Sequence, residues 1–451
     1  MDNETEKEFQ LYSHQAETVE FLSKTPRAFI TSDPGTGKTF ATTEAYSRNK
    51  TGRMLVLCPK SIMQASWGAD IKKFNSELTY SIYNIKNKEL AFLTGSDIVI
   101  MNHDAVKWLV KNTHLLSKFD WLVIDEFTAF KHRTSQRSKA VAKLTTYFNR
   151  RVLLSGTPNT NSVTELWHPT LILDEGERLG KNFFAFRNSV CAARQVGPSA
   201  QMVKWEDKPG SIEAVGDILR DITIRHELEE VLDMPEHIVR TLEVELSPKH
   251  LKQYNTLKAE SILELEQGDI NAVNAAVRAN KLMQMCSGAV YNEEGSYTPI
   301  HTERYELVMD LVMERQHSVV IVNWRHQTEE LINLATKAGI AYGRIDGSVS
   351  LENRTKHIED YQAGKLKVMF LHPSSGAHGV TLTKGTATIW ASPTYNLEHF
   401  TQANHRIYRA GQTKRTETIL IAAKDTLEPQ VYKALNTKEI SMSNMLNYLK
   451  T

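Results

Sequence analysis

The sequence predicts an α/β protein with two lobes, each built on a parallel sheet that helices cover on both faces. Between residues 28 and 156, short apolar runs rich in β-forming residues alternate with helical segments, and the alternation returns after residue 303. Continuous apolar runs separated by helices are typical of parallel strands that are buried on both faces. At 451 residues the chain is also too long for one ordinary core, which favours more than one domain.

The apolar runs that we expect as strands are residues 28–31, 54–58, 97–101, 121–124, 152–154, 319–322, 342–345, 368–371, 387–390 and 418–421. Between the two sets the alternation fades, and residues 211–232 and 249–286 have helical patterns. We therefore expect a first lobe over residues 1–170 and a second lobe over residues 301–451 that ends in a helical tail. Residues 171–300 are expected to hold mainly helical insertions and the connection between the lobes.

Composition leaves the class of partner open. The formal net charge is +1, from 54 Lys and Arg against 53 Asp and Glu, so gross charge neither supports nor excludes nucleic acid. The three cysteines are far apart in the sequence, which argues against a disulfide framework or a zinc site and fits a reducing compartment. The polar, acidic start resembles no signal peptide, and no apolar run approaches the ~20 residues that span a bilayer. We expect a cytoplasmic protein without a membrane partner.

The strongest motif is the glycine-bearing stretch Ser32–Thr39, between an apolar run and a helical segment. It nearly matches the phosphate-binding pattern G-x-x-x-x-G-K-[ST]. Gly35 and Gly37 let the backbone bend so that its N–H groups converge on phosphate oxygens, and the helix start adds partial positive charge. Lys38 would reach the β- and γ-phosphates, and the hydroxyl of Thr39 would hold Mg²⁺. The alternative is a tight turn with a solvated lysine.

A second motif is the acidic pair Asp125-Glu126, which follows the apolar run 121–124. Asp125 would hold Mg²⁺ through water, and Glu126 would orient and deprotonate the attacking water. The alternative is an ordinary acidic surface turn. Both this pair and the glycine-bearing loop follow predicted strands, and ligands of parallel sheets bind at the carboxyl ends of strands. The two motifs together predict a site for ATP and Mg²⁺.

A third motif covers residues 402–412. Arg406 and Arg409 are three residues apart, so on a helix they would share one face. Two guanidinium groups there could reach the γ-phosphate from the second lobe, as an arginine finger does. The alternative is an exposed basic helix face. Because two similar lobes carry one phosphate loop, we expect the nucleotide to be clamped between them.

Taken in order, these stretches resemble the motifs of the SNF2-type branch of superfamily 2 helicases and translocases. The similar stretches are residues 14–15, 32–39, 57–61, 125–128, 155–159, 246–254, 344–348, 376–383 and 402–412. The resemblance implies two RecA-like lobes, ATP hydrolysis and DNA as the track. It implies coupling of hydrolysis to motion for Ser155 and Thr157. It implies nucleotide binding for Gln15, Gly35, Thr36, Gly37, Lys38, Thr39 and Gly379.

The sequence also departs from the family's pattern. Ser32 stands where the first glycine of the loop is expected, and Phe127-Thr128 replace the Ala-His of the family's D-E-A-H motif. Thr381 replaces an asparagine, and Tyr408 replaces a histidine between the two arginines. These changes concern the coupling of hydrolysis to movement. They leave Lys38, Thr39, Asp125, Glu126, Arg406 and Arg409 intact.

Small polar or basic residues at strand ends suit contacts to a DNA backbone that read no sequence. The candidates are Lys60, Asn102, His103, Ser375 and Thr381, and for each of them a solvated surface is the alternative. The compact chain resembles small phage or bacterial members that act on forks and junctions. Our hypothesis is an ATP-dependent helicase or translocase for branched DNA, active in branch migration during replication, recombination or repair, with proteins of those processes as further partners.

Two other functions stay open. The chain could be an ATP-gated DNA-binding switch that does not separate strands. It could also be the motor subunit of a restriction system, which would need a separate nuclease chain because no nuclease-type cluster of carboxylates and lysine stands out.

Overall fold

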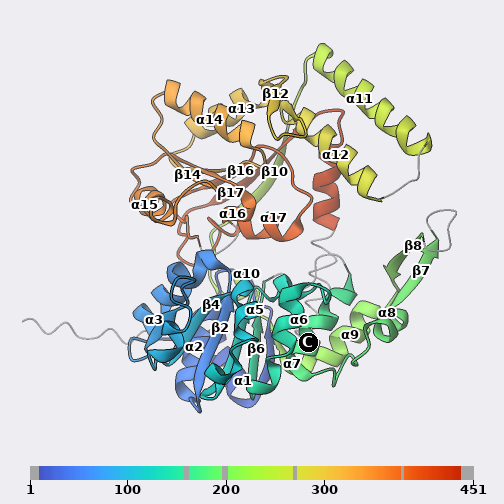
Figure 1. Ribbon diagram of the computed structural model, residues 1–451. Helices are drawn as coiled ribbons and strands as arrows, with labels where there is room; N and C mark the ends of the chain where they lie inside the picture. The colour runs from blue at the N-terminus through green and yellow to red at the C-terminus, as the bar shows by residue number, and fades with distance from the viewer. Residues whose placement is uncertain (1–9, 157–161, 196–201, 268–271, 377–379, 438–451) are drawn as a thin grey trace, which may run out of the picture. The chain divides into compact units, whose positions relative to one another are not determined.

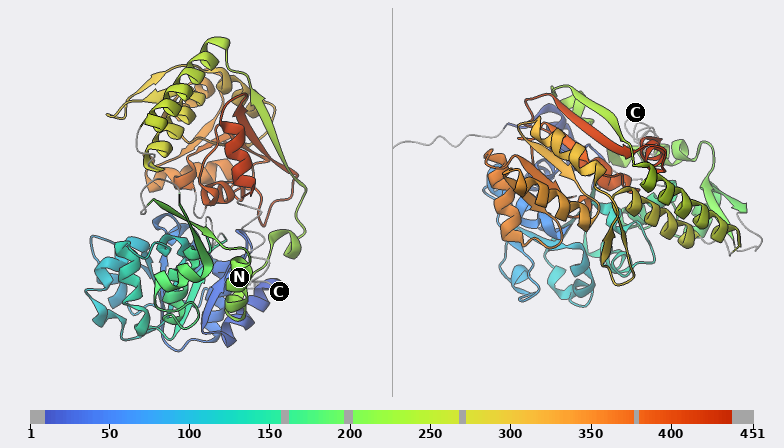
Figure 2. Two further views of the ribbon diagram at one scale, coloured as in Figure 1. Left: turned by 90° about the vertical axis from the view of Figure 1, so that its right-hand side faces the viewer. Right: turned by 90° about the horizontal axis from the view of Figure 1, so that it is seen from above.

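The computed structural model describes residues 10–156, 162–195, 202–267, 272–376 and 380–437. The chain divides between Asp233 and Met234 into two compact units, each with its own parallel sheet (Figure 1; further views in Figure 2). The predicted α/β class with two parallel sheets is therefore confirmed. No helix within the described ranges is both long and apolar enough to span a membrane.

The first unit is built on a seven-stranded sheet of order β3-β4-β2-β5-β6-β1-β9, in which every pair is parallel. Its strands are β1 (Arg27–Ile30), β2 (Arg53–Cys58), β3 (Tyr80–Ile82), β4 (Ile98–Asn102), β5 (Phe119–Asp125), β6 (Arg150–Leu154) and β9 (Thr223–Ile224). The five apolar runs expected in this unit are confirmed as the strands β1, β2, β4, β5 and β6. The short outer strands β3 and β9 carry no such run.

Helices pack against the sheet of the first unit (Figure 1). Val56 and Cys58 of β2 pack in one core with Val19 of α1 and Ala45 of α2, so residues of odd and even number go to different faces. That layer consists of α1 (Ser13–Lys24), α2 (Lys38–Arg48) and α3 (Ala69–Phe74). The other helices of the unit are α4 (Leu90–Leu93), α5 (Val106–Leu109), α6 (Gln136–Ala142), α7 (Trp167–Asp174), α8 (Phe183–Val190), α9 (Ser211–Leu219) and α10 (Leu228–Val231), beside the hairpin β7 (Cys191–Gln195) and β8 (Val203–Asp207).

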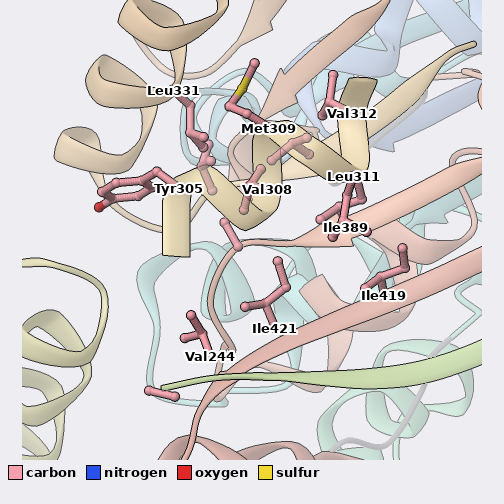
Figure 3. Packing of buried hydrophobic residues seen from close by; sticks show 14 of the residues in the cluster. Val244, Tyr305, Val308, Met309, Leu311, Val312, Leu331, Ile389, Ile419 and Ile421 are labelled. Carbon is pink, nitrogen blue, oxygen red and sulfur yellow. The ribbon is translucent and has the colours of Figure 1, made fainter. Parts of the chain in front are cut away.

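The second unit has a six-stranded parallel sheet of order β10-β17-β16-β13-β15-β14. Its strands are β10 (His237–Val244), β13 (Ser318–Ile321), β14 (Tyr342–Ile345), β15 (Val368–Leu371), β16 (Ala387–Trp390) and β17 (Thr416–Ala423). The remaining elements are α11 (Pro248–Gln267), α12 (Ala272–Cys286), β11 (Ala289–Tyr291), β12 (Tyr297–Pro299), α13 (Glu303–Met313), α14 (Arg325–Lys337), α15 (Leu351–Gln362), α16 (Pro373–Gly376), α17 (Leu397–Asn404) and a helix over 428–437. Figure 3 shows Val308 and Val312 of α13 packed over Ile389 and Ile421 of the sheet.

The expected connecting region 171–300 requires correction, because it is divided between the two units. Strand β9 closes the first sheet, which also interrupts the helix expected over 211–232. Strand β10 pairs with β17 along its whole length and opens the second sheet, so the second unit begins at Met234 rather than at residue 301. The single helical segment expected over 249–286 contains two helices, α11 and α12. The expected helical tail reaches residue 437, and the rest of it lies outside the described residues.

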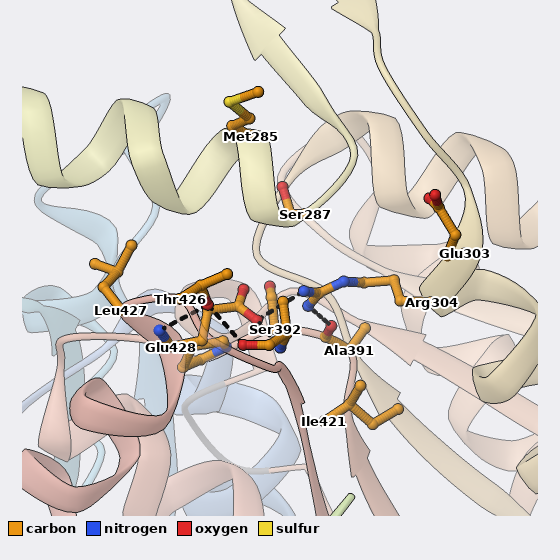
Figure 4. Close-up of polar contacts among 12 residues, drawn as sticks. Met285, Ser287, Glu303, Arg304, Ala391, Ser392, Ile421, Thr426, Leu427 and Glu428 are labelled. Atoms are coloured by element: carbon orange, nitrogen blue, oxygen red, sulfur yellow. Dashed lines mark hydrogen bonds and ion pairs between the residues drawn. The ribbon is translucent and has the colours of Figure 1, made fainter. Parts of the chain in front are cut away.

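A buried ion pair ties the second unit together (Figure 4). Nη2 of Arg304 on α13 lies 2.7 Å from Oε2 of Glu428, and both side chains are fully buried. Arg304 also donates through Nη1 to the carbonyl oxygen of Ala391, and Glu428 Oε2 accepts the N–H of Ala423. The pair therefore joins α13 to the carboxyl ends of β16 and β17. Such a charge stays buried only because its partner is present.

Replacing Glu428 by Gln should destabilise the chain by about 3–5 kcal/mol, because the Arg304 guanidinium would be left buried without its counter-charge. Urea unfolding of the full chain, followed by circular dichroism, measures this change. The matched control is Glu20→Gln, which breaks a pair with Lys24 whose side chains are 67% and 72% exposed, and should leave the curve unchanged. The double variant Arg304→Met/Glu428→Leu should regain most of the loss. Unchanged unfolding of Glu428→Gln would contradict this role.

Candidate functional site

The predicted phosphate loop connects β1 to α2 and has the backbone conformation that its glycines suggest. Gly35 and Gly37 have φ angles of +91° and +85°, in the left-handed region that favours glycine. A Cβ atom at Gly37 would also lie only 2.2 Å from Nε2 of Gln15, so a side chain there would displace that amide. The loop leads directly into α2, whose first N–H groups have no partner within the helix. This geometry is suited to binding an anion.

Lys38 is held by the loop itself. Its ammonium group donates to the carbonyl oxygens of Ser32 at 2.7 Å and Asp33 at 3.0 Å. A phosphate that entered the loop would offer this ammonium a charged acceptor in place of neutral ones, and charge-assisted hydrogen bonds are roughly twice as strong. Thr39 follows at the start of α2 and is half-buried.

Helix α1 supports the same loop from one side. The carbonyl oxygen of Thr36 accepts hydrogen bonds from Nε2 of His14 at 2.9 Å and from Nε2 of Gln15 at 3.2 Å. The other end of the Gln15 amide, Oε1, accepts the N–H of Tyr12 at 3.1 Å. Gln15 is therefore a structural contact of the loop, and nucleotide binding by its side chain stays a prediction.

The segment after β9 anchors the loop from the other side. Ser32 Oγ accepts the N–H of His226 at 3.0 Å, and Asp33 Oδ2 accepts the N–H of Leu228 at 3.1 Å. The nearly buried Arg225 lies 3.2 Å from the other oxygen of Asp33. The serine that departs from the glycine pattern thus fastens the loop to β9. Sequence reasoning missed residues 225–228, because they form no motif and follow the phosphate loop by almost two hundred residues in the sequence.

The acidic pair lies at the carboxyl end of β5. Oδ2 of Asp125 accepts a hydrogen bond from the indole Nε1 of the fully buried Trp67 at 2.9 Å, and Oδ1 accepts the N–H of Glu126 at 3.0 Å. Burial raises the pKa of Asp125, and the Trp67 hydrogen bond and the positive charge of Lys38 oppose that rise. Nothing in the sequence around Trp67 indicated this contact.

The backbone at Glu126 adopts a conformation that is uncommon outside glycine, with φ at +53°. Its carboxylate oxygen Oε2 lies 3.3 Å from Oγ of Ser155, which donates to it. Ser155 follows β6, and its N–H donates to the carbonyl oxygen of Ile30 in β1. The next residue, Gly156, has no room for a Cβ because Pro34 of the loop is 2.8 Å away. Thr157 lies outside the described residues.

The first unit therefore gathers the phosphate loop, the acidic pair and Ser155 at one edge of its sheet. The oxygen donors of Thr39 and Asp125 fit a hard cation such as Mg²⁺. In the described part of the chain, no group of three or more His, Cys, Asp or Glu side chains could hold a metal ion. The two oxygen donors therefore suit a Mg²⁺ ion whose other ligands are phosphate oxygens and waters.

One predicted DNA contact requires correction. His103 is 7% exposed, and its Nε2 donates to the carbonyl oxygen of Asp125 at 2.8 Å. The ring meets Phe130 edge-on at 5.0 Å, and burial lowers the pKa of His103 to about 4. His103 therefore holds the end of β5 from within and does not present its ring to a ligand. Lys60 is exposed and Asn102 is half-buried at the end of β4, so contacts of these two with DNA stay predictions.

In the second unit, the prediction that one helix carries Arg406 and Arg409 is wrong. Helix α17 ends at Asn404, and both arginines lie in turns beyond it. They are brought together by a shared acceptor: Nη1 of Arg406 and Nη1 of Arg409 lie 3.2 and 3.4 Å from the carbonyl oxygen of Val380. The Gln412 amide nitrogen lies 3.0 Å from each of three carbonyl oxygens, those of Thr383, Gly385 and Ile407.

Residues 380–385 and 406–412 consequently form one hydrogen-bonded element, although they are separate motifs in the sequence. Thr381 is half-buried within it. Ser375 is half-buried on the short helix α16, and Gly379 lies outside the described residues. The roles of Ser375 and Thr381 toward DNA stay predictions, as does nucleotide binding by Gly379.

Comparison with known proteins gives matches along most of the chain. Residues 14–289 match the SNF2-related domain, and residues 303–411 match the helicase conserved C-terminal domain. Protein p41 of Acyrthosiphon pisum secondary endosymbiont phage 1 is 28% identical, over 98% of this chain and 99% of its own. An uncharacterized ATP-dependent helicase of Mycoplasma genitalium is 24% identical over 91% of this chain, which spans only 39% of that protein.

Among solved structures, the SWI2/SNF2 ATPase core of Sulfolobus solfataricus in complex with dsDNA is 20% identical, with a TM-score of 0.44, and the match covers 97% of this chain and 94% of that one. The SNF2-related match alone covers more than half of this chain and includes every site residue of the first unit. The chain belongs to the SNF2-related family, within the SNF2-type branch of superfamily 2 ATP-dependent helicases and translocases.

Proposed function

We propose that this protein uses ATP hydrolysis to move along branched DNA, and that it acts at forks and junctions by branch migration. The observation that carries the proposal is the convergence of the phosphate loop, Asp125-Glu126 and Ser155 at one sheet edge of an SNF2-related chain. The phage protein that matches over 99% of its own length supports a compact chain of this size. The Mycoplasma relative is named an ATP-dependent helicase, which supports the use of ATP.

In the chemical step, Lys38 moves from its two loop carbonyls to the phosphates, and the N–H groups of the loop bind the remaining phosphate oxygens. Thr39 and Asp125 would hold Mg²⁺, which would neutralise the charge that develops on the phosphate oxygens. Glu126 orients and deprotonates the attacking water. Ser155 donates to the Glu126 carboxylate and fixes its direction, so it is a positioning residue.

Arg406 and Arg409 complete the mechanism from the second lobe. We assign them the stabilisation of charge on the γ-phosphate when the lobes close. Both guanidinium groups donate to the backbone carbonyl of Val380, and a phosphate would offer them a charged acceptor. Loss of the γ-phosphate then releases the second lobe. If each lobe holds the DNA backbone with different affinity in the two states, the cycle produces directed movement.

The site predicts different defects for two substitutions in the first lobe. Glu126→Gln should retain ATP binding and slow hydrolysis by roughly 10²–10⁴-fold, since only the proton acceptor is lost. Lys38→Ala should weaken nucleotide binding itself, because the phosphates lose their charged donor. Equilibrium binding of a fluorescent ATP analogue and steady-state phosphate release separate the two effects. Glu77→Gln, at an exposed glutamate of the same lobe, is the control. Near-normal phosphate release by Glu126→Gln would remove Glu126 from the reaction.

The second lobe yields an independent prediction. Arg409→Ala should reduce DNA-stimulated ATP hydrolysis by about 3–5 orders of magnitude while ATP affinity changes little, because a finger acts on the transition state. The control is Arg240→Ala. It removes a guanidinium on the edge strand β10 that pairs with Glu417 of β17. A variant of Arg409 with full turnover would show that the arginine serves only the fold.

Substrate choice is tested with a DNA panel. ATP turnover should rise most with fork and four-way-junction DNA and less with linear duplex or single strands, and a labelled junction should be converted to its products only with ATP. If junctions stimulate turnover but never move, the protein is an ATP-gated switch and not a branch-migration motor. Equal stimulation by linear duplex and junction would contradict the branched-DNA assignment and leave the general motor intact.

A further inference from the structure

A cationic pocket lies on the first unit between α5, α6 and α7. It has a volume of about 670 Å³ and is open to solvent along one side. We call it the α6 pocket. Its rim carries Lys107, Lys111, Arg133, Lys139 and Lys143, and none of the residues that line it is an Asp or a Glu. The chain as a whole is almost neutral, so this concentration of positive charge is not a consequence of composition.

Three of these lysines have no counter-charge in the described residues. Lys107 pairs with Asp104 at 3.4 Å, and the Arg133 guanidinium lies over the ring of Phe183 at 4.6 Å. Lys111, Lys139 and Lys143 are exposed and form no ion pair with any side chain that the structure describes. Lys139 and Lys143 are one turn apart on the α6 side of the pocket, so their charges repel. A negatively charged ligand would relieve that repulsion.

Apolar side chains form the floor of the α6 pocket. Val110 and Leu171 are half-buried there, beside the more deeply buried Ala140 and Trp167. The floor is rigid, because Trp167 Nε1 donates to the carbonyl oxygen of Gly180 and the adjacent His168 donates to that of Phe130. The pocket thus combines an apolar floor with a rim of lysines.

We propose that the α6 pocket binds an acidic peptide segment of a partner protein, with carboxylates on the lysines and an apolar side chain on the floor. The charge pattern alone would also suit nucleic acid, but the floor favours a peptide. A duplex presents phosphates and sugars and stacks its bases inside, so it gains little from apolar surface. Unstacked bases need an open aromatic face, and Trp167 is only 5% exposed. A peptide can offer charge and an apolar anchor within a few residues.

The test uses the full chain and a fluorescein-labelled short peptide of aspartates interrupted by one leucine and one phenylalanine. Fluorescence anisotropy should show saturable binding that weakens with added salt. The variant Lys111→Ala/Lys139→Ala/Lys143→Ala should bind at least ~10-fold more weakly, because charges facing the carboxylates are lost. A matched control, Lys86→Ala/Lys88→Ala/Lys118→Ala, removes three exposed lysines elsewhere in this unit and should bind as the parent does. A second peptide, with serine for leucine and phenylalanine, should bind more weakly than the first.

Basal ATP hydrolysis of the triple variant should equal that of the parent, which shows that it is folded. Absence of saturable peptide binding overturns the proposal, as does equal affinity for the parent and the triple variant. Loss of duplex-DNA affinity in the triple variant, with no peptide binding by the parent, would identify the pocket as a DNA contact and also overturn it. Since peptide binding needs neither nucleotide nor DNA, failure here is distinct from failure of the motor function.

Discussion

Parallel pairing of β5, β6 and β1 is the constraint on which the site of the first unit depends. It brings the ends of three strands, far apart in the sequence, to the same edge of the sheet. The phosphate loop, the acidic pair and Ser155 can then meet over a few ångströms, as the bond from Ser155 to Glu126 shows. No single motif contains this site. The register of the sheet assembles it, and the buried apolar runs determine that register.

Around this edge, polar side chains are fixed by partners that have no role in chemistry. Trp67 binds a carboxylate oxygen of Asp125, His103 binds its backbone carbonyl, and the segment after β9 holds the start of the phosphate loop. Such supporting contacts position reactive groups before the ligand arrives, which lowers the cost of organising them during the reaction. The left-handed backbone at Glu126 belongs to the same arrangement, since it turns the chain sharply at the strand end.

The sequence predicted the central strands because their apolar runs are long and buried on both faces, as in β5 and β15. It missed β10, whose middle residues are exposed and include Arg240 and Glu243, because an edge strand needs no continuous apolar run. It missed the supporting role of Trp67 and placed His103 on the surface, since only the folded chain brings these side chains to Asp125. The turn at Arg406 and Arg409 was predicted as a helix because spacing alone cannot show where α17 ends.

The attachment of residues 225–228 to the phosphate loop has a mechanical consequence. Strand β9 belongs to the first sheet and β10 to the second, and residues 225–236 lead directly from one to the other. The start of that tether is pinned to Ser32 and Asp33. A force along residues 225–236 would therefore act directly on the backbone of the phosphate loop.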